Sequence, residues 1–146
     1  MDTIQLPQDF REFLKSFNSK KVEYLVIGGY AVGYYGYPRP TGDLDIWISN
    51  APDNAERARE ALEEFGFYCP IDALLKEDEV VRMGIPPFRI EVLKRIDGVN
   101  FSDCYSGRVT ADVSGVEMSL ISLTHLKQNK TASGRSKDVN DLENLP

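Results

Sequence analysis

Two aspartates stand two residues apart at the start of a run, 43–48, that favours a β-strand. Because successive side chains of a strand point to opposite faces, Asp43 and Asp45 project from the same face. Two neighbouring carboxylates repel each other unless a cation or a basic partner lies between them. Magnesium is the natural ion, with manganese as the alternative, because a hard cation takes carboxylates together with substrate phosphates. The competing interpretation is an exposed strand face with ordinary solvated charges.

A glycine pair lies upstream, between an apolar segment, 22–27, that predicts a strand and a segment, 30–35, that predicts a helix. Gly28 and Gly29 therefore stand where backbone amides and a helix N-terminus can meet a phosphate. The alternative is a plain tight turn, because glycine also serves wherever φ is positive. The pair belongs neither to a P-loop nor to a dinucleotide fingerprint, since the required spacings of glycine and lysine are absent.

A third acid interrupts a later apolar strand, 88–93. Glu91 on a strand next to the two aspartates would complete a two-metal site. The alternative is a surface glutamate paired with Arg89 or Lys94. The residues alone leave both interpretations open.

The rest of the chain must position these groups, and its pattern alternates between the two kinds of element. Helices are predicted for 10–17, 30–35, 54–65, 101–106, 122–130 and 137–145, and strands for 22–27, 43–48, 80–83, 88–93, 108–113 and 116–121. Strands interspersed with helices, hairpins included, predict an α+β domain with a small mixed sheet. Trp47 is expected in the core, on the face opposite the aspartates. The last helix is expected to pack through Val139, Leu142 and Leu145.

Length and composition limit the class of protein. A chain of 146 residues predicts one domain, 1–146, with a core at about 20–121 and a helical segment at about 122–146. A net charge of −6 argues against a protein that coats nucleic acid through bulk electrostatics. No apolar run approaches the roughly 20 residues that span a bilayer, and Cys69 and Cys104 suggest free thiols. We therefore expect a cytoplasmic protein with no membrane partner.

These runs resemble a known superfamily. VIGGYAV at 26–32, followed by YPRPTGDLDIW at 37–47, resembles the nucleotidyltransferase superfamily that includes DNA polymerase beta and the small bacterial minimal nucleotidyltransferases. The later runs RIEVL, GVNFS and LKQNKTASGRSKDVNDL look like a stand-alone bacterial subgroup associated with toxin–antitoxin systems. The resemblance covers nearly the whole chain and implies the α+β nucleotidyltransferase fold.

By that resemblance, Gly28 and Gly29 would bind the triphosphate, while Asp43 and Asp45 would hold magnesium. Glu91 stands at the third-carboxylate position, where aspartate is more usual in the superfamily. The implied reaction is metal-assisted transfer of a nucleoside monophosphate from a nucleoside triphosphate to a hydroxyl group.

Basic residues extend the implied site. Similar proteins place cations near the metal, which makes Arg39, Lys130 and Arg135 candidates for phosphate or acceptor contacts. Each has a structural alternative as a solvated or ion-paired residue, and for Lys130 the two weigh evenly. Asp138 and Asp141 are expected to be capping or ion-pair residues that fix the end of the chain on the core.

The acceptor is expected to be a protein hydroxyl or tRNA rather than a small metabolite, with a toxin–antitoxin partner protein as the setting. The main rival is a non-catalytic antitoxin or regulator that keeps the fold and binds a partner. A metal-dependent phosphohydrolase would share the acids and release phosphate instead. Binding of a triphosphate in the presence of metal separates the first rival, and product analysis separates the second.

Overall fold

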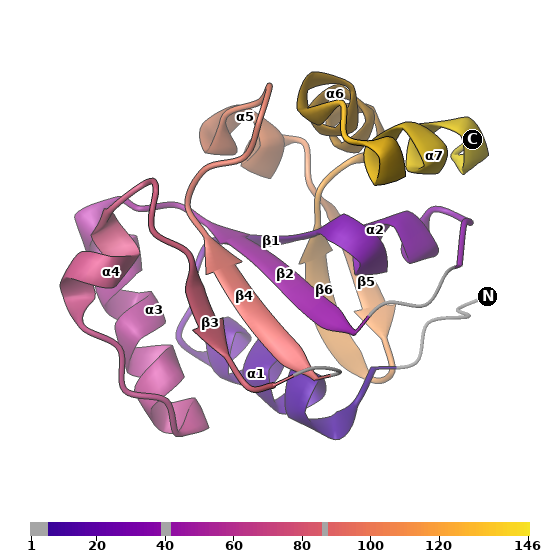
Figure 1. Ribbon diagram of the computed structural model, residues 1–146. Helices are drawn as coiled ribbons and strands as arrows, with labels where there is room; N and C mark the ends of the chain where they lie inside the picture. The colour runs from indigo at the N-terminus through magenta and orange to yellow at the C-terminus, as the bar shows by residue number, and fades with distance from the viewer. Residues whose placement is uncertain (1–5, 39–41, 86–87) are drawn as a thin grey trace.

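The computed structural model describes residues 6–38, 42–85 and 88–146, in which a six-stranded sheet is flanked by helices (Figure 1). The strands are β1 (Tyr24–Ile27), β2 (Asp43–Ile48), β3 (Val81–Met83), β4 (Arg89–Leu93), β5 (Val109–Val113) and β6 (Val116–Leu120). The helices are α1 (Gln8–Ser19), α2 (Gly28–Tyr34), α3 (Pro52–Phe65), α4 (Ile71–Leu75), α5 (Phe101–Ser106), α6 (Leu123–Ser133) and α7 (Ser136–Asn144). The sequence pattern predicted all of these except α4.

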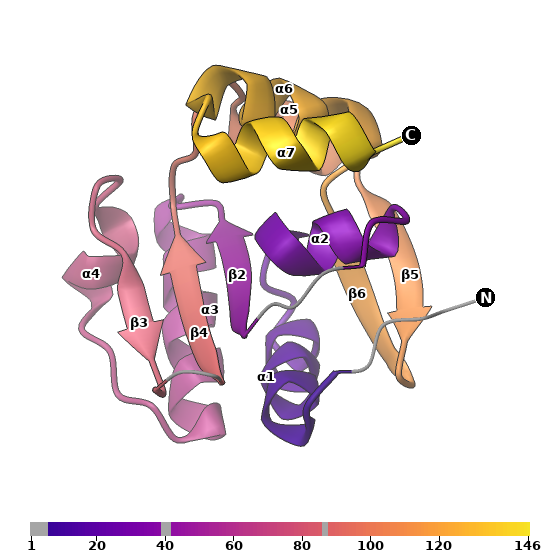
Figure 2. The same ribbon diagram turned by 45° about the vertical axis from the view of Figure 1, so that its right-hand side comes forward.

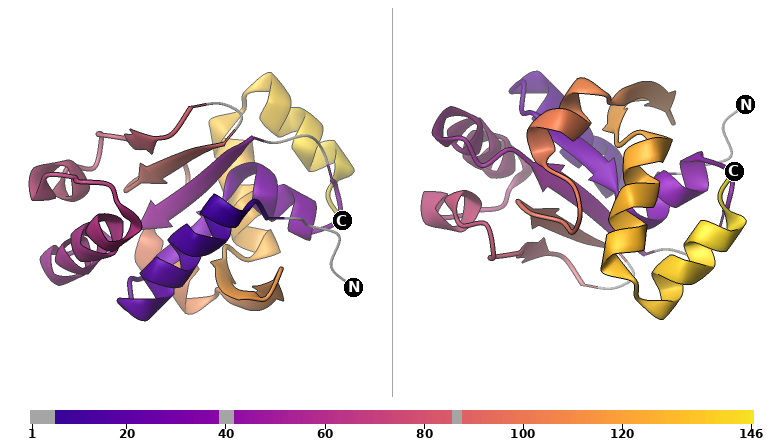
Figure 3. Two further views of the ribbon diagram at one scale, coloured as in Figure 1. Left: turned by 90° about the horizontal axis from the view of Figure 1, so that it is seen from below. Right: turned by 90° about the horizontal axis from the view of Figure 1, so that it is seen from above.

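The sheet is mixed, with strand order β3-β4-β2-β1-β6-β5. β1 runs antiparallel to β2, whereas β2 is parallel to β4 and β1 is parallel to β6. Figure 2 shows α5, α6 and α7 gathered at the top of the view, with α1 at the opposite end. The views from above and below show the sheet between these two groups (Figure 3). The predicted α+β architecture with a mixed sheet and a C-terminal helical segment is confirmed.

The first helix anchors one side of the sheet through an aromatic stripe. Phe10, Phe13, Leu14 and Phe17 recur at helical spacing and are completely buried. The rings of Phe13 and Phe17 stack at a centroid distance of 4.3 Å. The helix predicted over 10–17 is therefore confirmed, and it is slightly longer at both ends.

Trp47 requires a correction. It is buried as predicted, but positions 43, 45 and 47 of β2 share one face because a strand has a period of two. Trp47 therefore continues the face that carries Asp43 and Asp45. It is buried there because Phe101 of α5 packs against it, with ring centroids 5.2 Å apart.

The packed face of α7 also differs from the prediction. Val139 is 46% exposed and Leu142 only partly buried, whereas Asp138 and Asp141 are each 1% exposed. The helix turns its two aspartates inward together with Leu145, at the spacing of a helical face. Buried carboxylates of this kind need a cationic partner, and α6 provides one.

Within the described ranges, no helix combines the length and the apolar character that a transmembrane segment needs.

Candidate functional site

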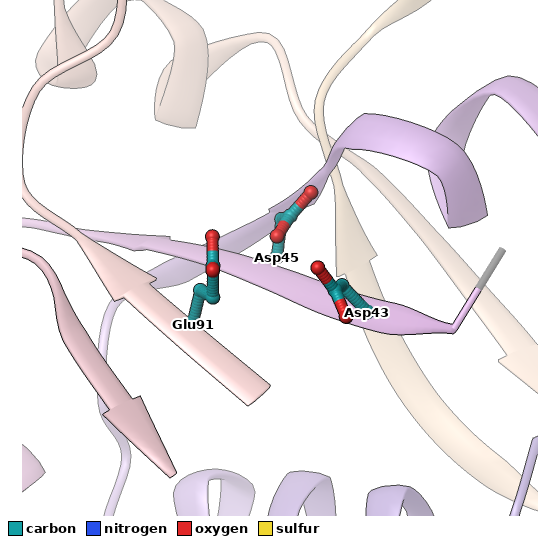
Figure 4. Close-up of side chains that lie close together, drawn as sticks. All are labelled: Asp43, Asp45 and Glu91. Atoms are coloured by element: carbon teal, nitrogen blue, oxygen red, sulfur yellow. The ribbon is translucent and has the colours of Figure 1, made fainter. Parts of the chain in front are cut away.

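Three carboxylates meet on one face of the sheet, on the adjacent parallel strands β2 and β4. The register pairs Asp45 with Glu91, and Asp43 lies two residues before Asp45 on β2. One oxygen from each of the three side chains lies within 4.8 Å of the others. Figure 4 shows the three groups directed toward a common point. This spacing suits a divalent cation with oxygen ligands.

Asp45 is partly buried and lies between Asp43 on its own strand and Glu91 on β4. Burial raises its pKa from 3.8 to about 6, and the neighbouring charges of Glu91 and Asp43 add to the rise. Lys137 and Lys130 oppose this effect, since a nearby cation favours the ionised carboxylate. The ionised form of Asp45 is therefore costly in the protein alone and would be favoured by a bound cation.

Two arginines already pair with the other acids. The guanidinium of Arg89 donates a hydrogen bond from Nη2 to Asp43 Oδ2 at 2.9 Å, and its Nε lies 3.3 Å from Glu91 Oε2. Arg82 donates to the same Glu91 oxygen at 3.0 Å. The expected pairing of Glu91 with Arg89 is thus present, while Lys94 instead bonds the backbone carbonyls of Ala73 and Glu79. Glu91 belongs to the acidic cluster and is ion-paired as well.

Gly28 meets Asp45 so closely that no side chain would fit. Its φ is +69°, and a Cβ at this position would lie 2.3 Å from Asp45 Oδ2. The glycine is therefore required both for the left-handed backbone conformation and for the approach of the turn to the carboxylate. Gly29 is buried in the first turn of α2 and is not among the residues that line the cleft.

The Gly28→Ala variant is expected to bind Mn²⁺ at least about tenfold more weakly. The added methyl group would push the Asp45 carboxylate out of position, and disturbing the orientation of a metal ligand commonly costs that much affinity. Calorimetric titration with Mn²⁺ measures the change. Gly115→Ala is the matched control, since Gly115 also has a positive φ, +82°, with nothing within 4 Å of the added Cβ. Equal Mn²⁺ affinity in Gly28→Ala and in the control would show that the contact with Asp45 has no bearing on the metal.

The three carboxylates and Gly28 line a cleft of about 610 Å³ between the strands and the C-terminal helices. Its walls include six of the residues singled out from the sequence: Gly28, Asp43, Asp45, Glu91, Lys130 and Arg135. Arg39 lies outside the described residues. The cleft also contains Arg95 and Lys137, which the sequence analysis did not select, although Lys137 lies in the basic run that includes Arg135. The structure thus brings the acids, the glycine turn and several cations together.

Lys130 is buried in an ion-pair network. Its Nζ lies 3.0 Å from Asp138 Oδ1 and 3.0 Å from Asp141 Oδ2, and the residue is 3% exposed. Asp138 Oδ2 also accepts hydrogen bonds from Ser133 at 2.6 Å and Arg135 at 2.8 Å. Burial acts to raise the pKa of Asp138, but the hydrogen bonds from Arg135, Ser133 and Lys130 outweigh it and lower that pKa. The structural interpretation of the two aspartates is confirmed, and Lys130 is their partner.

The sequence matches no family model and no curated protein. Several chains of known structure are similar in fold. A candidate nucleotidyltransferase from Thermotoga maritima gives a TM-score of 0.63 at 17% identity, covering 92% of this chain and 88% of its own. An antigenic nucleotidyltransferase-like protein from Paracoccidioides brasiliensis gives 0.58 at 16% identity, covering 92% and 72%. The chain has the nucleotidyltransferase fold, with an acidic triad on its sheet that is able to hold a divalent metal.

Proposed function

We propose that this protein is a metal-dependent nucleotidyltransferase that moves a nucleoside monophosphate from a nucleoside triphosphate to a hydroxyl of a protein or RNA acceptor. The observation that carries the proposal is the convergence of Asp43, Asp45 and Glu91 beside the Gly28 turn, within one cleft. Metal, phosphate and cations then have neighbouring sites on a fold that nucleotidyltransferases share.

The chemistry of the donor set fits a divalent ion. Three carboxylates within 4.8 Å offer hard oxygen ligands, and the raised pKa of Asp45 reflects burial and crowding that a cation would relieve. Magnesium is the expected ion, with manganese as a substitute. When bound, it would neutralise charge on the phosphates and orient the triphosphate for transfer.

The residues of the chain then have separate tasks. Asp43, Asp45 and Glu91 would hold the ion, and the Gly28 turn, which lines the same cleft, would meet the triphosphate. Cations from the C-terminal helices form the facing wall of the cleft. The acceptor oxygen forms a bond to the α-phosphorus as the bond to the departing pyrophosphate breaks. Most of the catalytic effect would come from positioning and charge stabilisation.

The resemblance of the C-terminal run to toxin–antitoxin proteins supports a protein or tRNA acceptor and a partner protein from such a system, and the free thiols of Cys69 and Cys104 support a cytoplasmic setting. The alternative is a non-catalytic antitoxin or regulator. The acidic triad disfavours it, because crowded, partly buried carboxylates are a liability in a module that only binds a partner.

The decisive experiment incubates the protein with Mg²⁺ and each α-labelled nucleoside triphosphate, alone and with host lysate, and separates protein from RNA. We expect label on one macromolecule with the wild type and loss of at least about 99% of it with Asp45→Asn, because a missing metal ligand removes the charge stabilisation of transfer. Lys76→Gln, altered at an exposed position outside the cleft, serves as the control. Labelling that survives in Asp45→Asn would contradict the proposal, and released phosphate would identify a phosphohydrolase.

A further inference from the structure

The cationic side chains that line the cleft are Arg89, Arg95, Lys130, Arg135 and Lys137. Three of these five already form ion pairs with carboxylates. Arg89 pairs with Asp43 and Glu91, and both Lys130 and Arg135 pair with Asp138. A cation already held by a carboxylate must give up that partner before it can bind a phosphate, which reduces its net contribution.

Lys137 differs from these three. It is exposed in the first turn of α7, and within the described part of the chain it makes no hydrogen bond or ion pair. Its ammonium group nevertheless acts on the acidic triad, since Lys137 is the cation that most strongly lowers the pKa of Asp45. Lys137 thus combines an uncommitted charge with a position across the cleft from the carboxylates.

The backbone that carries Lys137 is well fixed. α6 ends at Gly134, whose φ of +66° reverses the chain into α7. On either side of this turn, Ser133, Arg135 and the buried Lys130 all bind the carboxylate of Asp138, the residue next to Lys137. The turn is therefore held by several bonds while the ammonium group of Lys137 stays free to meet a ligand.

We propose that Lys137 binds the phosphate oxygens of the triphosphate, and that Lys130, with Asp138 and Asp141, positions Lys137 instead of binding phosphate itself. This inference rests on the proposed function. A metal-bound triphosphate carries excess negative charge, and Lys137 can neutralise part of it without breaking an existing ion pair. The α6–α7 turn becomes the phosphate-binding wall opposite the metal.

The test measures binding of an α,β-methylene nucleoside triphosphate, which cannot be cleaved at the α-phosphorus, by calorimetry in the presence of Mg²⁺. Lys137→Gln is expected to bind it at least about tenfold more weakly, because a charge-assisted hydrogen bond is lost. Inorganic tripolyphosphate should show the same loss, since the interaction is with phosphate. Lys137→Arg should recover part of the affinity. Raising the salt concentration should narrow the difference between wild type and Lys137→Gln.

The control is Lys76→Gln, which makes the same charge change at an exposed position outside the cleft. Its triphosphate affinity should equal that of the wild type, whereas Lys137→Gln should bind Mn²⁺ at least as tightly as the wild type, because a cation near the carboxylates is removed, and should keep the wild-type urea midpoint. If wild type binds triphosphate and Lys137→Gln binds it within twofold, the role of Lys137 is refuted while the proposed function stands. If wild type binds no triphosphate, the proposed function fails and this assignment fails with it.

Discussion

Replacing Lys130 by methionine is expected to lower the free energy of unfolding by about 3 to 5 kcal/mol, the usual cost of removing one partner from a buried ion pair. Methionine keeps much of the side-chain volume but leaves Asp138 and Asp141 facing each other at 1% exposure without their shared cation. The buried carboxylates then carry a desolvation penalty that Lys130 had offset. The loss should shrink at low pH, where the carboxylates take up protons.

Urea unfolding followed by the fluorescence of Trp47, the only tryptophan, measures the change. Lys127→Met is the control on the same helix, where a half-buried lysine outside the network, bonded to the Pro146 carbonyl, is changed and less than about 1 kcal/mol should be lost. Adding Asp138→Asn and Asp141→Asn to Lys130→Met should recover much of the stability, because the uncompensated charges are gone. A single variant as stable as the Lys127→Met control would mean that the network contributes nothing to folding.

The triad shows how far the sequence could lead. The two-residue period of a strand places Asp43 and Asp45 on one face without further information. Glu91 is different, because the chain between β2 and β4 passes through α3, α4 and β3, and only the folded register sets Asp45 opposite Glu91. The sequence could suggest a third acid, but its distance from the others depends on tertiary structure.

The cations of the C-terminal segment show the opposite limit. Lys130, Arg135 and Lys137 look alike in sequence, as basic residues in a polar run. Their different environments arise from the turn at Gly134, which lets Asp138 and Asp141 reach Lys130 and leaves Lys137 on the cleft side. The apolar pattern of α7 gave the wrong packed face for the same reason. The helix buries the ion-paired carboxylates of Asp138 and Asp141 and leaves Val139 exposed. Periodicity identifies a face, and ion pairing can override it.

Replacing Asp45 by asparagine is expected to stabilise the metal-free protein at pH 7 by about 2 to 3 kcal/mol, since each unit of pKa shift corresponds to about 1.4 kcal/mol. The pKa of Asp45 is raised in the folded protein from 3.8 to about 6. Between these values the folded state binds a proton that the unfolded chain has released, so the stability of the wild type falls as pH rises from about 4 to about 6. Asparagine has no charge to bury and lacks this loss.

Urea unfolding followed by circular dichroism at several pH values tests the sign as well as the size. The two proteins should be nearly equal in stability below pH 4 and diverge until about pH 6 to 7. Asp43→Asn is the control, because it removes the partner of Arg89 and should give no such gain. Equal stability of Asp45→Asn and wild type at pH 7 would show that burial of this carboxylate carries no penalty.

Saturating Mg²⁺ should reverse the order of stability. A ligand that binds only the folded state raises its stability, and the wild type keeps all three carboxylates whereas Asp45→Asn does not. The variant that is more stable without metal should therefore gain less from it and lose nucleotidyl transfer. A carboxylate that weakens the metal-free fold and strengthens the metal-bound one is retained for its ligand, since a purely structural residue would stabilise the protein under both conditions.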